Sequence, residues 1–143
     1  MATIRRATTH WEGSLLEGGG RVSLDSSGVG TYDVTWASRA QDPAGRTSPE
    51  ELIAAAHSAC FSMALSNALA KSGNAPDQLD TTAAVTFQPG EGITGITLSV
   101  VGHVPGLTSD QFRLAAEDAK ANCPVSKALA GTTITLDATL AGD

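Results

Sequence analysis

The chain is organised around one long segment, residues 47–73, which reads TSPEELIAAAHSACFSMALSNALAKSG. Ser48 is a favourable N-cap residue, Pro49 suits the first helical position, and Glu51 stands three residues after Ser48, as in a capping box. Gly73 is typical of the residue that ends a helix. The pattern predicts a single helix from residue 49 to about residue 72.

Small or apolar residues occupy every face of this predicted helix, which indicates that protein surrounds it on all sides. A chain of 143 residues can rarely enclose so long a helix alone, so we expect a second subunit to cover part of it. A membrane span is the competing interpretation. His57, Ser58 and Asn67 lie within the segment and its composition is weak for insertion, so no membrane association is expected.

Strand patterns flank the helix on both sides. Before it, the runs 3–12, 21–25 and 31–39 predict an antiparallel meander. After it come a hairpin, 79–87 with 93–104, and a helix from 109 to about 122 that the capping-box pair Thr108 and Gln111 opens. A short helix from Pro124 to Gly131 and a last strand, 132–140, follow. This order of elements predicts an α+β fold in one domain, residues 1–143.

Composition narrows the class of protein. Hydrophobic residues make up 41% of the chain and charged residues 17%, as in a globular domain. The net charge of −6 argues against nucleic acid as a partner, because no surplus of Lys and Arg exists to replace counterions. No apolar run follows Arg5 and Arg6, so a signal peptide is not indicated and a cytoplasmic location is expected.

The two cysteines, Cys60 and Cys123, are the candidates for chemical reactivity in this chain. Cys60 lies in an apolar part of the long helix, where a small buried hydrophobe is the simplest interpretation. Cys123 precedes Pro124 at a helix start, where free N–H groups stabilise a thiolate. Residues alone therefore leave two alternatives open for the pair, packing and redox chemistry.

His57 stands three residues before Cys60 and so shares its helix face. This spacing permits an imidazolium–thiolate pair, or a zinc site completed by Cys123. A metal site needs a third protein ligand, and neither His10 nor His103 stands at a sequence spacing typical of a zinc site. We therefore expect no metal, and a core or interface position for His57.

Two segments carry a family resemblance. Residues 47–66, TSPEELIAAAHSACFSMALS, and residues 121–129, ANCPVSKAL, closely resemble the two cysteine signatures of the OsmC/Ohr family of thiol peroxidases. The sequence HWEG at residues 10–13 and the chain length also fit. His57 and the Phe-Ser-Met run after Cys60 are similar to the osmotically inducible OsmC branch of that family.

The resemblance implies an OsmC-like α+β fold with antiparallel sheets packed on a long central helix, in an intertwined homodimer. It implies reduction of organic hydroperoxides, with hydrogen peroxide as a poorer substrate, and no cofactor. By analogy Cys60 is the peroxidatic cysteine, which becomes a sulfenic acid, and Cys123 is the resolving cysteine. An external dithiol or a lipoylated protein would then reduce the disulfide.

The family also places an arginine and a glutamate beside the reactive thiol. Glu50 matches the glutamate by its spacing from Cys60. In the OsmC branch the arginine follows the third strand, which selects Arg39, whereas the other branch takes it from the earlier hairpin, nearer Arg21. We predict Arg39.

The chemistry itself requires a positive charge near Cys60. A thiol of pKa ~8.5 is only about 3% ionised at pH 7, and the thiolate is the nucleophile. Cys60 lies about 15 Å along the axis from Glu50, beyond the reach of the helix terminus. By the same distance Glu50 cannot approach the Cys60 of its own helix, so we predict that it serves the Cys60 of the other subunit.

Small apolar residues around Cys60 suggest a pocket for an alkyl chain, and two alternative functions follow from the same residues. One is a binding protein for a hydrophobic ligand, with cysteines that only pack. The other is a general thiol–disulfide oxidoreductase, which the lack of a C-x-x-C motif disfavours.

Overall fold

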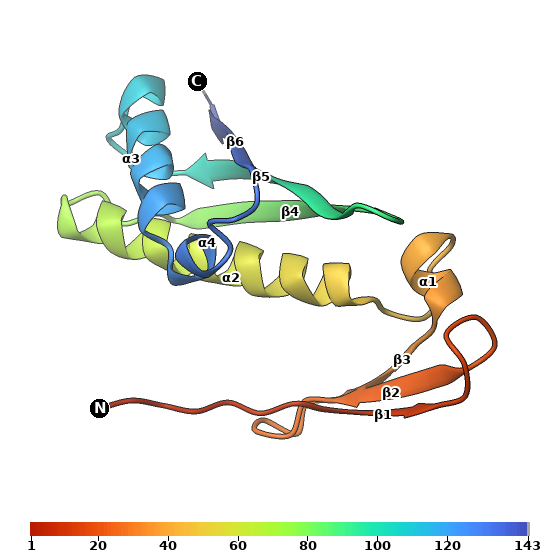
Figure 1. Ribbon diagram of the computed structural model, residues 1–143. Helices are drawn as coiled ribbons and strands as arrows, with labels where there is room; N and C mark the ends of the chain where they lie inside the picture. Colours follow the sequence, from red (N-terminus) through yellow and green to blue (C-terminus); the bar gives the residue numbers. More distant parts are fainter. Residues whose placement is uncertain (143) are drawn as a thin grey trace. The chain divides into compact units, whose positions relative to one another are not determined.

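The computed structural model describes residues 1–142, and Figure 1 shows the order of its elements. The chain divides into two compact units, residues 1–52 and residues 53 onward. The division falls within the long helix α2 (Pro49–Lys71), whose first turn belongs to the first unit. Whether the chain acts as a single domain stays a prediction.

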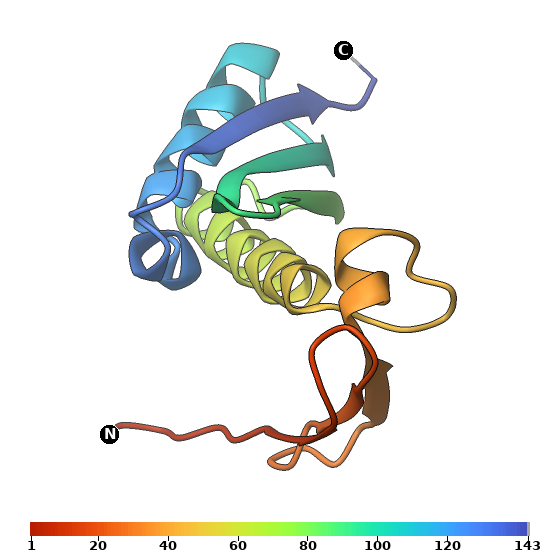
Figure 2. The same ribbon diagram turned by 45° about the vertical axis from the view of Figure 1, so that its right-hand side comes forward.

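The first unit holds a three-stranded antiparallel sheet in the order β1-β2-β3. A short helix α1, the orange coil in Figure 2, follows it. The bounds are β1 Thr8–Glu12, β2 Gly19–Ser23, β3 Thr31–Val34 and α1 Trp36–Ala40. The predicted meander is confirmed, but its third strand ends early: the second half of the predicted strand 31–39 is wrong and forms α1.

The physical reason for α1 is a capping box that the sequence pattern did not reveal. The Thr35 side chain accepts a hydrogen bond from the Ser38 N–H at 3.0 Å, and the Ser38 hydroxyl oxygen accepts one from the Thr35 N–H at 3.0 Å. Serine takes the place of the usual Glu or Gln at the third helical position. The Ser38 hydroxyl also donates to the Thr47 carbonyl at 2.9 Å, which ties α1 to the segment that leads into α2.

Helix α2 begins where predicted, with a modified cap. Ser48 Oγ accepts a hydrogen bond from the Glu51 N–H at 3.1 Å, as in a capping box. The Glu51 carboxylate instead accepts from the Thr47 hydroxyl at 2.5 Å, so only half of the predicted box forms. The helix runs to Lys71, and Gly73, at φ 89°, stops it within one residue of the predicted end.

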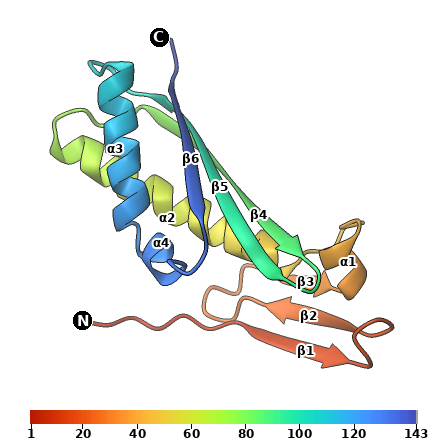
Figure 3. The same cartoon turned by 45° about the horizontal axis from the view of Figure 1, so that its top comes forward.

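The second unit contains the sheet β4-β5-β6, in which β4 (Gln78–Gln88) and β5 (Gly92–His103) form the predicted antiparallel hairpin (Figure 3). Strand β6 (Ile134–Leu140) pairs with β5 in parallel, so the expectation of wholly antiparallel sheets is wrong here. Helices α3 (Ser109–Asn122) and α4 (Pro124–Ala128) provide the crossover that a parallel pair needs. Thr108 and Gln111 form the predicted capping box of α3.

The core of the second unit lies between the sheet and the two long helices. Its largest fully buried apolar side chains come from α2, α3 and β5: Phe61, Leu65, Leu69, Phe112, Leu98 and Val100. A β-carbon on Gly102 of β5 would lie 2.5 Å from Phe112 Cζ, so only glycine allows the α3 ring to lie this close to the strand. This close packing holds α3, and with it Cys123 at its end, against the sheet.

One face of α2 remains open in the single chain. Ala55, Ala56, Ala59 and Met63 are exposed, and Met63 is 73% exposed despite its apolar side chain. One chain alone therefore does not enclose α2 completely, as expected for a chain of this length. By length and composition α2 would also be able to cross a membrane, a test that the core helix of a soluble protein passes equally.

Candidate active site

The structure brings the two cysteines together. Cys60 lies on α2, and Cys123 is both the C-cap residue of α3 and the N-cap residue of α4. Both are free thiols, Cys123 fully buried and Cys60 partly buried, and their side chains share a hydrogen bond. The two thiols are therefore close neighbours, as a disulfide between them would require.

The two thiols differ in their electrostatic surroundings. Burial raises the pKa of the Cys60 thiol, and its hydrogen bond with Cys123 raises it further, against a smaller lowering by the Val125 N–H. Burial also acts to raise the pKa of Cys123, but hydrogen bonds from Cys60 and Ser126 and the Val125 N–H outweigh it, so the pKa of Cys123 is lowered. Within residues 53–142 the surroundings therefore favour the thiolate form of Cys123 and disfavour that of Cys60.

Arg39 and Glu50 form the second part of the predicted site. The Arg39 guanidinium, on α1, binds the Glu50 carboxylate in the first turn of α2 through two edges, Nε–Oε1 at 2.9 Å and Nη2–Oε2 at 2.9 Å. The Glu50 side chain is 8% exposed and that of Arg39 is 30% exposed. Such a bidentate pair fixes the plane of the guanidinium. Arg21, the other candidate, lies on β2, is exposed, and faces Asp33 at 3.5 Å.

An apolar hollow of about 340 Å³ adjoins Arg39 within the first unit. Its lining consists of Thr9, Trp11, Leu15, Val22, Val34, Thr35, Trp36, Arg39, Pro49 and Leu52. The sequence placed the pocket among the small residues near Cys60 and missed this hollow. The one signal for it in the sequence was that both tryptophans of the chain, Trp11 and Trp36, precede the long helix.

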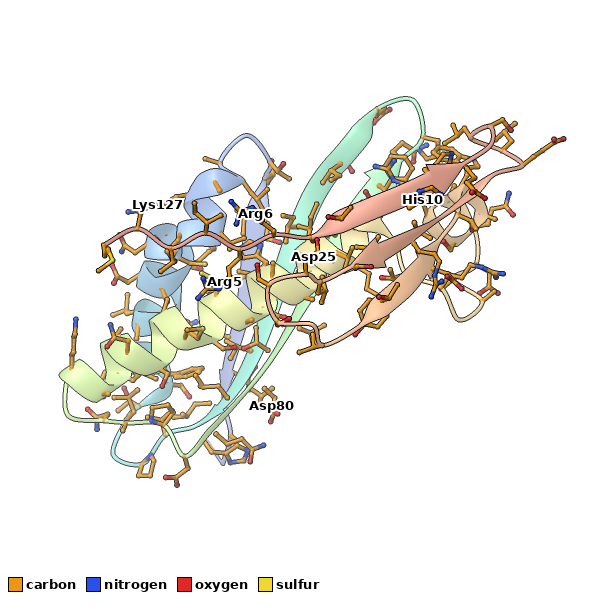
Figure 4. The ribbon with its side chains drawn as sticks, turned by 90° about the horizontal axis from the view of Figure 1, so that it is seen from below. Arg5, Arg6, His10, Asp25, Asp80 and Lys127 are labelled. Atoms are coloured by element: carbon orange, nitrogen blue, oxygen red, sulfur yellow. The ribbon has the colours of Figure 1, made fainter. Side chains whose placement is uncertain are left out.

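His57 occupies neither of the roles that its spacing permits. Its ring is fully buried, burial lowers its pKa, and a neutral imidazole cannot form the imidazolium–thiolate pair. Nε2 instead lies 2.8 Å from Ser126 Oγ. His10, labelled on β1 in Figure 4, is exposed and lies 3.1 Å from a Glu12 oxygen. In residues 1–142 no three His, Cys, Asp or Glu side chains gather as a metal site would need.

Two reduced cysteines in hydrogen-bonded contact at a helix junction are the arrangement of a thiol-redox protein, here on an α+β fold. The chain belongs to the OsmC family. The model of that family, described as OsmC-like protein, matches residues 41–137. The sequence is 41% identical over 140 residues to Peroxiredoxin OsmC of Escherichia coli (strain K12), covering 96% of both chains.

Solved structures agree with this membership. The fold resembles the organic hydroperoxide resistance protein OhrB of Bacillus subtilis, with a TM-score of 0.66, 25% identity and coverage of 94% of this chain and 97% of that one. It also resembles an organic hydroperoxide resistance protein OsmC from Legionella pneumophila, with a TM-score of 0.71, 22% identity and coverage of 98% of each chain. The family resemblance read from the two cysteine segments is thus confirmed, as is the α+β class.

Proposed function

We propose that the protein is a cysteine-based peroxidase that reduces organic hydroperoxides to alcohols. The observation that carries this proposal is the contact between Cys60 and Cys123 in a chain 41% identical to a protein named peroxiredoxin. The Cys60 thiolate attacks the terminal peroxide oxygen, so an S–O bond forms as the O–O bond breaks. The alkoxide leaves with a proton as the alcohol, and Cys60 becomes a sulfenic acid. Cys123 then forms a disulfide with it.

The positive charge that Cys60 needs is the partner subunit's Arg39. Cys60 follows Glu50 by ten residues of one uninterrupted helix, about 15 Å along its axis, which the Glu50–Arg39 pair of the same chain cannot cross. The open apolar face of α2, formed by Ala55, Ala56, Ala59 and Met63, is a surface that a second copy would bury. The active unit is therefore a homodimer with composite sites.

Arg39 has two tasks at such a site. A guanidinium ~4 Å from the sulfur contributes roughly 4 kcal/mol at an effective dielectric of about 20, comparable with about three pKa units. This contribution opposes the burial that raises the pKa of Cys60. The same guanidinium donates to the peroxide oxygens and stabilises the charge on the departing alkoxide, while Glu50 holds it in position.

The apolar hollow beside Arg39 supports an organic substrate over hydrogen peroxide. Its volume of about 340 Å³ lies at the lower end of the range for ligand sites, so a short alkyl or aryl group would fill it. The guanidinium at its edge would then face the peroxide end of the molecule. Reducing equivalents would come from an external dithiol or a lipoylated protein in the cytoplasm.

The direct test is a titration of the reduced protein with one equivalent of an alkyl hydroperoxide, followed by mass mapping of the cysteines. We expect a Cys60–Cys123 disulfide within seconds, and in Cys123→Ser a sulfenic acid on Cys60 that a dimedone-type reagent traps. Hydrogen peroxide at the same dose should act more slowly. Thiols that stay unmodified would overturn the peroxidase assignment.

The hollow itself also favours a second candidate, a binding protein for a hydrophobic ligand. On that hypothesis the cysteines only pack, so Cys60→Ser would bind an alkyl ligand as tightly as the parent chain. The two hypotheses differ in the reaction with an alkyl hydroperoxide: the peroxidase proposal predicts that the parent chain reacts and Cys60→Ser does not, whereas a binding protein would react in neither form.

Composite sites predict complementation between two inactive chains. A Cys60→Ser chain and a Glu50→Ala chain, co-expressed with different affinity tags, would form mixed dimers that retain one site with Cys60, Glu50 and Arg39 all intact. Such dimers should show about half of the parent activity per dimer, because one of the two sites is undamaged. Mixed dimers no more active than either mutant homodimer would show that each site is built within one chain.

A further inference from the structure

A buried polar chain leads away from Cys123, and the peroxidase chemistry described above does not use it. His57 on α2 is fully buried, and its Nε2 lies 2.8 Å from the hydroxyl of Ser126 on α4. Its Nδ1 has no hydrogen-bond partner within the described part of the chain. A fully buried imidazole with one nitrogen engaged and the other unpartnered is costly, so its retention requires an explanation.

Ser126 connects this histidine to the resolving cysteine. It stands three residues after Cys123, and its hydroxyl and N–H both lower the pKa of the Cys123 thiol. A serine hydroxyl has a single hydrogen. When that hydrogen points at the sulfur, the oxygen can only accept from His57, so Nε2 carries the imidazole proton.

The tautomer with hydrogen on Nε2 also explains the unpartnered atom. Nδ1 then carries no hydrogen, and no N–H group is left without an acceptor in the core. Because burial lowers the pKa of His57, the ring stays neutral at physiological pH. It contributes an oriented dipole rather than a charge.

We propose that His57 and Ser126 are positioning residues for Cys123, with His57 Nε2–H donating to Ser126 Oγ and the Ser126 hydroxyl donating to the Cys123 sulfur. The inference rests on the proposed peroxidase function and deepens its second step. The hydrogen-bonded chain orients the sulfur and stabilises it as a thiolate at the moment of attack on oxidised Cys60.

The step balances as follows. The Cys123 thiolate gives an electron pair to the sulfenic sulfur of Cys60, so an S–S bond forms and the S–O bond breaks. The departing hydroxide takes up the proton that the Cys123 thiol had released and leaves as water. Cys123 is oxidised and the sulfenic sulfur of Cys60 is reduced, with no further reactant required.

His57 and Ser126 matter most after peroxide has oxidised Cys60. In the reduced protein Cys60 itself donates a hydrogen bond that stabilises the Cys123 thiolate. Oxidation converts the Cys60 thiol to a sulfenic acid and so alters this donor. Ser126 then remains as the side-chain donor to Cys123, and His57 keeps its hydroxyl directed at the sulfur.

The test separates the two steps by rapid quenching and mass analysis. Ser126→Ala and His57→Phe should leave oxidation of Cys60 unchanged and slow disulfide formation by about tenfold, the effect of losing one hydrogen bond to a charged group. Ser126→Thr and His57→Gln, which retain the donors, should recover most of the rate. The matched control is Ser62→Ala, which removes another α2-associated hydroxyl that donates to the Ser58 carbonyl and lies against Thr81.

A second readout does not depend on peroxide. In a Cys60→Ser background, the pH dependence of alkylation reports the pKa of Cys123, which should rise by about one unit on Ser126→Ala and on His57→Phe. The inference would be overturned if Ser126→Ala changed neither the rate of disulfide formation nor the pKa of Cys123. This outcome would be decisive even if the His57 variants failed to fold. Failure of the parent protein to react with hydroperoxide would overturn the proposed function alone, because the alkylation measurement would still test the positioning.

Discussion

Cys60→Ser is expected to abolish hydroperoxide reduction to the background rate. A serine hydroxyl stays un-ionised at neutral pH and cannot pass through the sulfenic acid and disulfide states that carry the electrons. The measurement is consumption of an alkyl hydroperoxide in the presence of a small dithiol. Circular dichroism would confirm that the variant folds, as expected for a side chain of similar size on the partly buried face of α2.

Cys123→Ser is the matched control for this variant. It keeps the peroxidatic thiol, so it should consume one equivalent of hydroperoxide per chain and then stop or slow sharply. The structure makes the reverse outcome informative, because within one chain the pKa of Cys123 is lowered while that of Cys60 is raised. First-turnover activity that survives in Cys60→Ser and disappears in Cys123→Ser would assign the attack on peroxide to Cys123.

Arg39→Met should lower kcat/KM for an organic hydroperoxide by about 10²- to 10³-fold, the range for loss of a donor to developing negative charge. Because burial raises the pKa of Cys60, removal of the cation should also move the half-maximal rate of Cys60 oxidation to higher pH. Arg39→Lys should recover part of the rate, since it keeps the charge but not the bidentate pairing with Glu50.

Arg21→Met provides the control for this prediction. Arg21 carries the same charge but is exposed on β2 beside Asp33, so its removal should leave the rate within twofold of the parent. A large loss in Arg21→Met with normal rates in Arg39→Met would transfer the role to the hairpin arginine.

Local signals in the sequence were sufficient to predict much of the fold. Ser48, Pro49 and Gly73 bound α2 within a residue or two, and Thr108 with Gln111 open α3 as expected. Helix α1 was not predictable, because its capping box uses Ser38 where the pattern asks for Glu or Gln. The parallel pairing of β6 was missed since alternation shows which residues share a face and not which neighbour the strand joins.

The candidate site, like the fold, could be predicted only in part from the sequence. Its residues were chosen by resemblance to family signatures, and the structure pairs Cys60 with Cys123 and Arg39 with Glu50. The contact of His57 with Ser126 joins residues 69 positions apart, and no spacing rule indicates it. The direction in which each thiol pKa is shifted depends on which donors surround its sulfur, and these come together only in the folded chain.

The position of the two cysteines on separate segments has a thermodynamic consequence for the catalytic cycle. A bond from Cys60 to Cys123 closes a covalent loop that contains the whole β4–β5 hairpin and α3. Closing a loop of that length reduces the entropy of the unfolded chain, worth roughly 4 kcal/mol. On the proposed mechanism the disulfide form would thus resist heat and proteases better than the reduced form that reacts with peroxide.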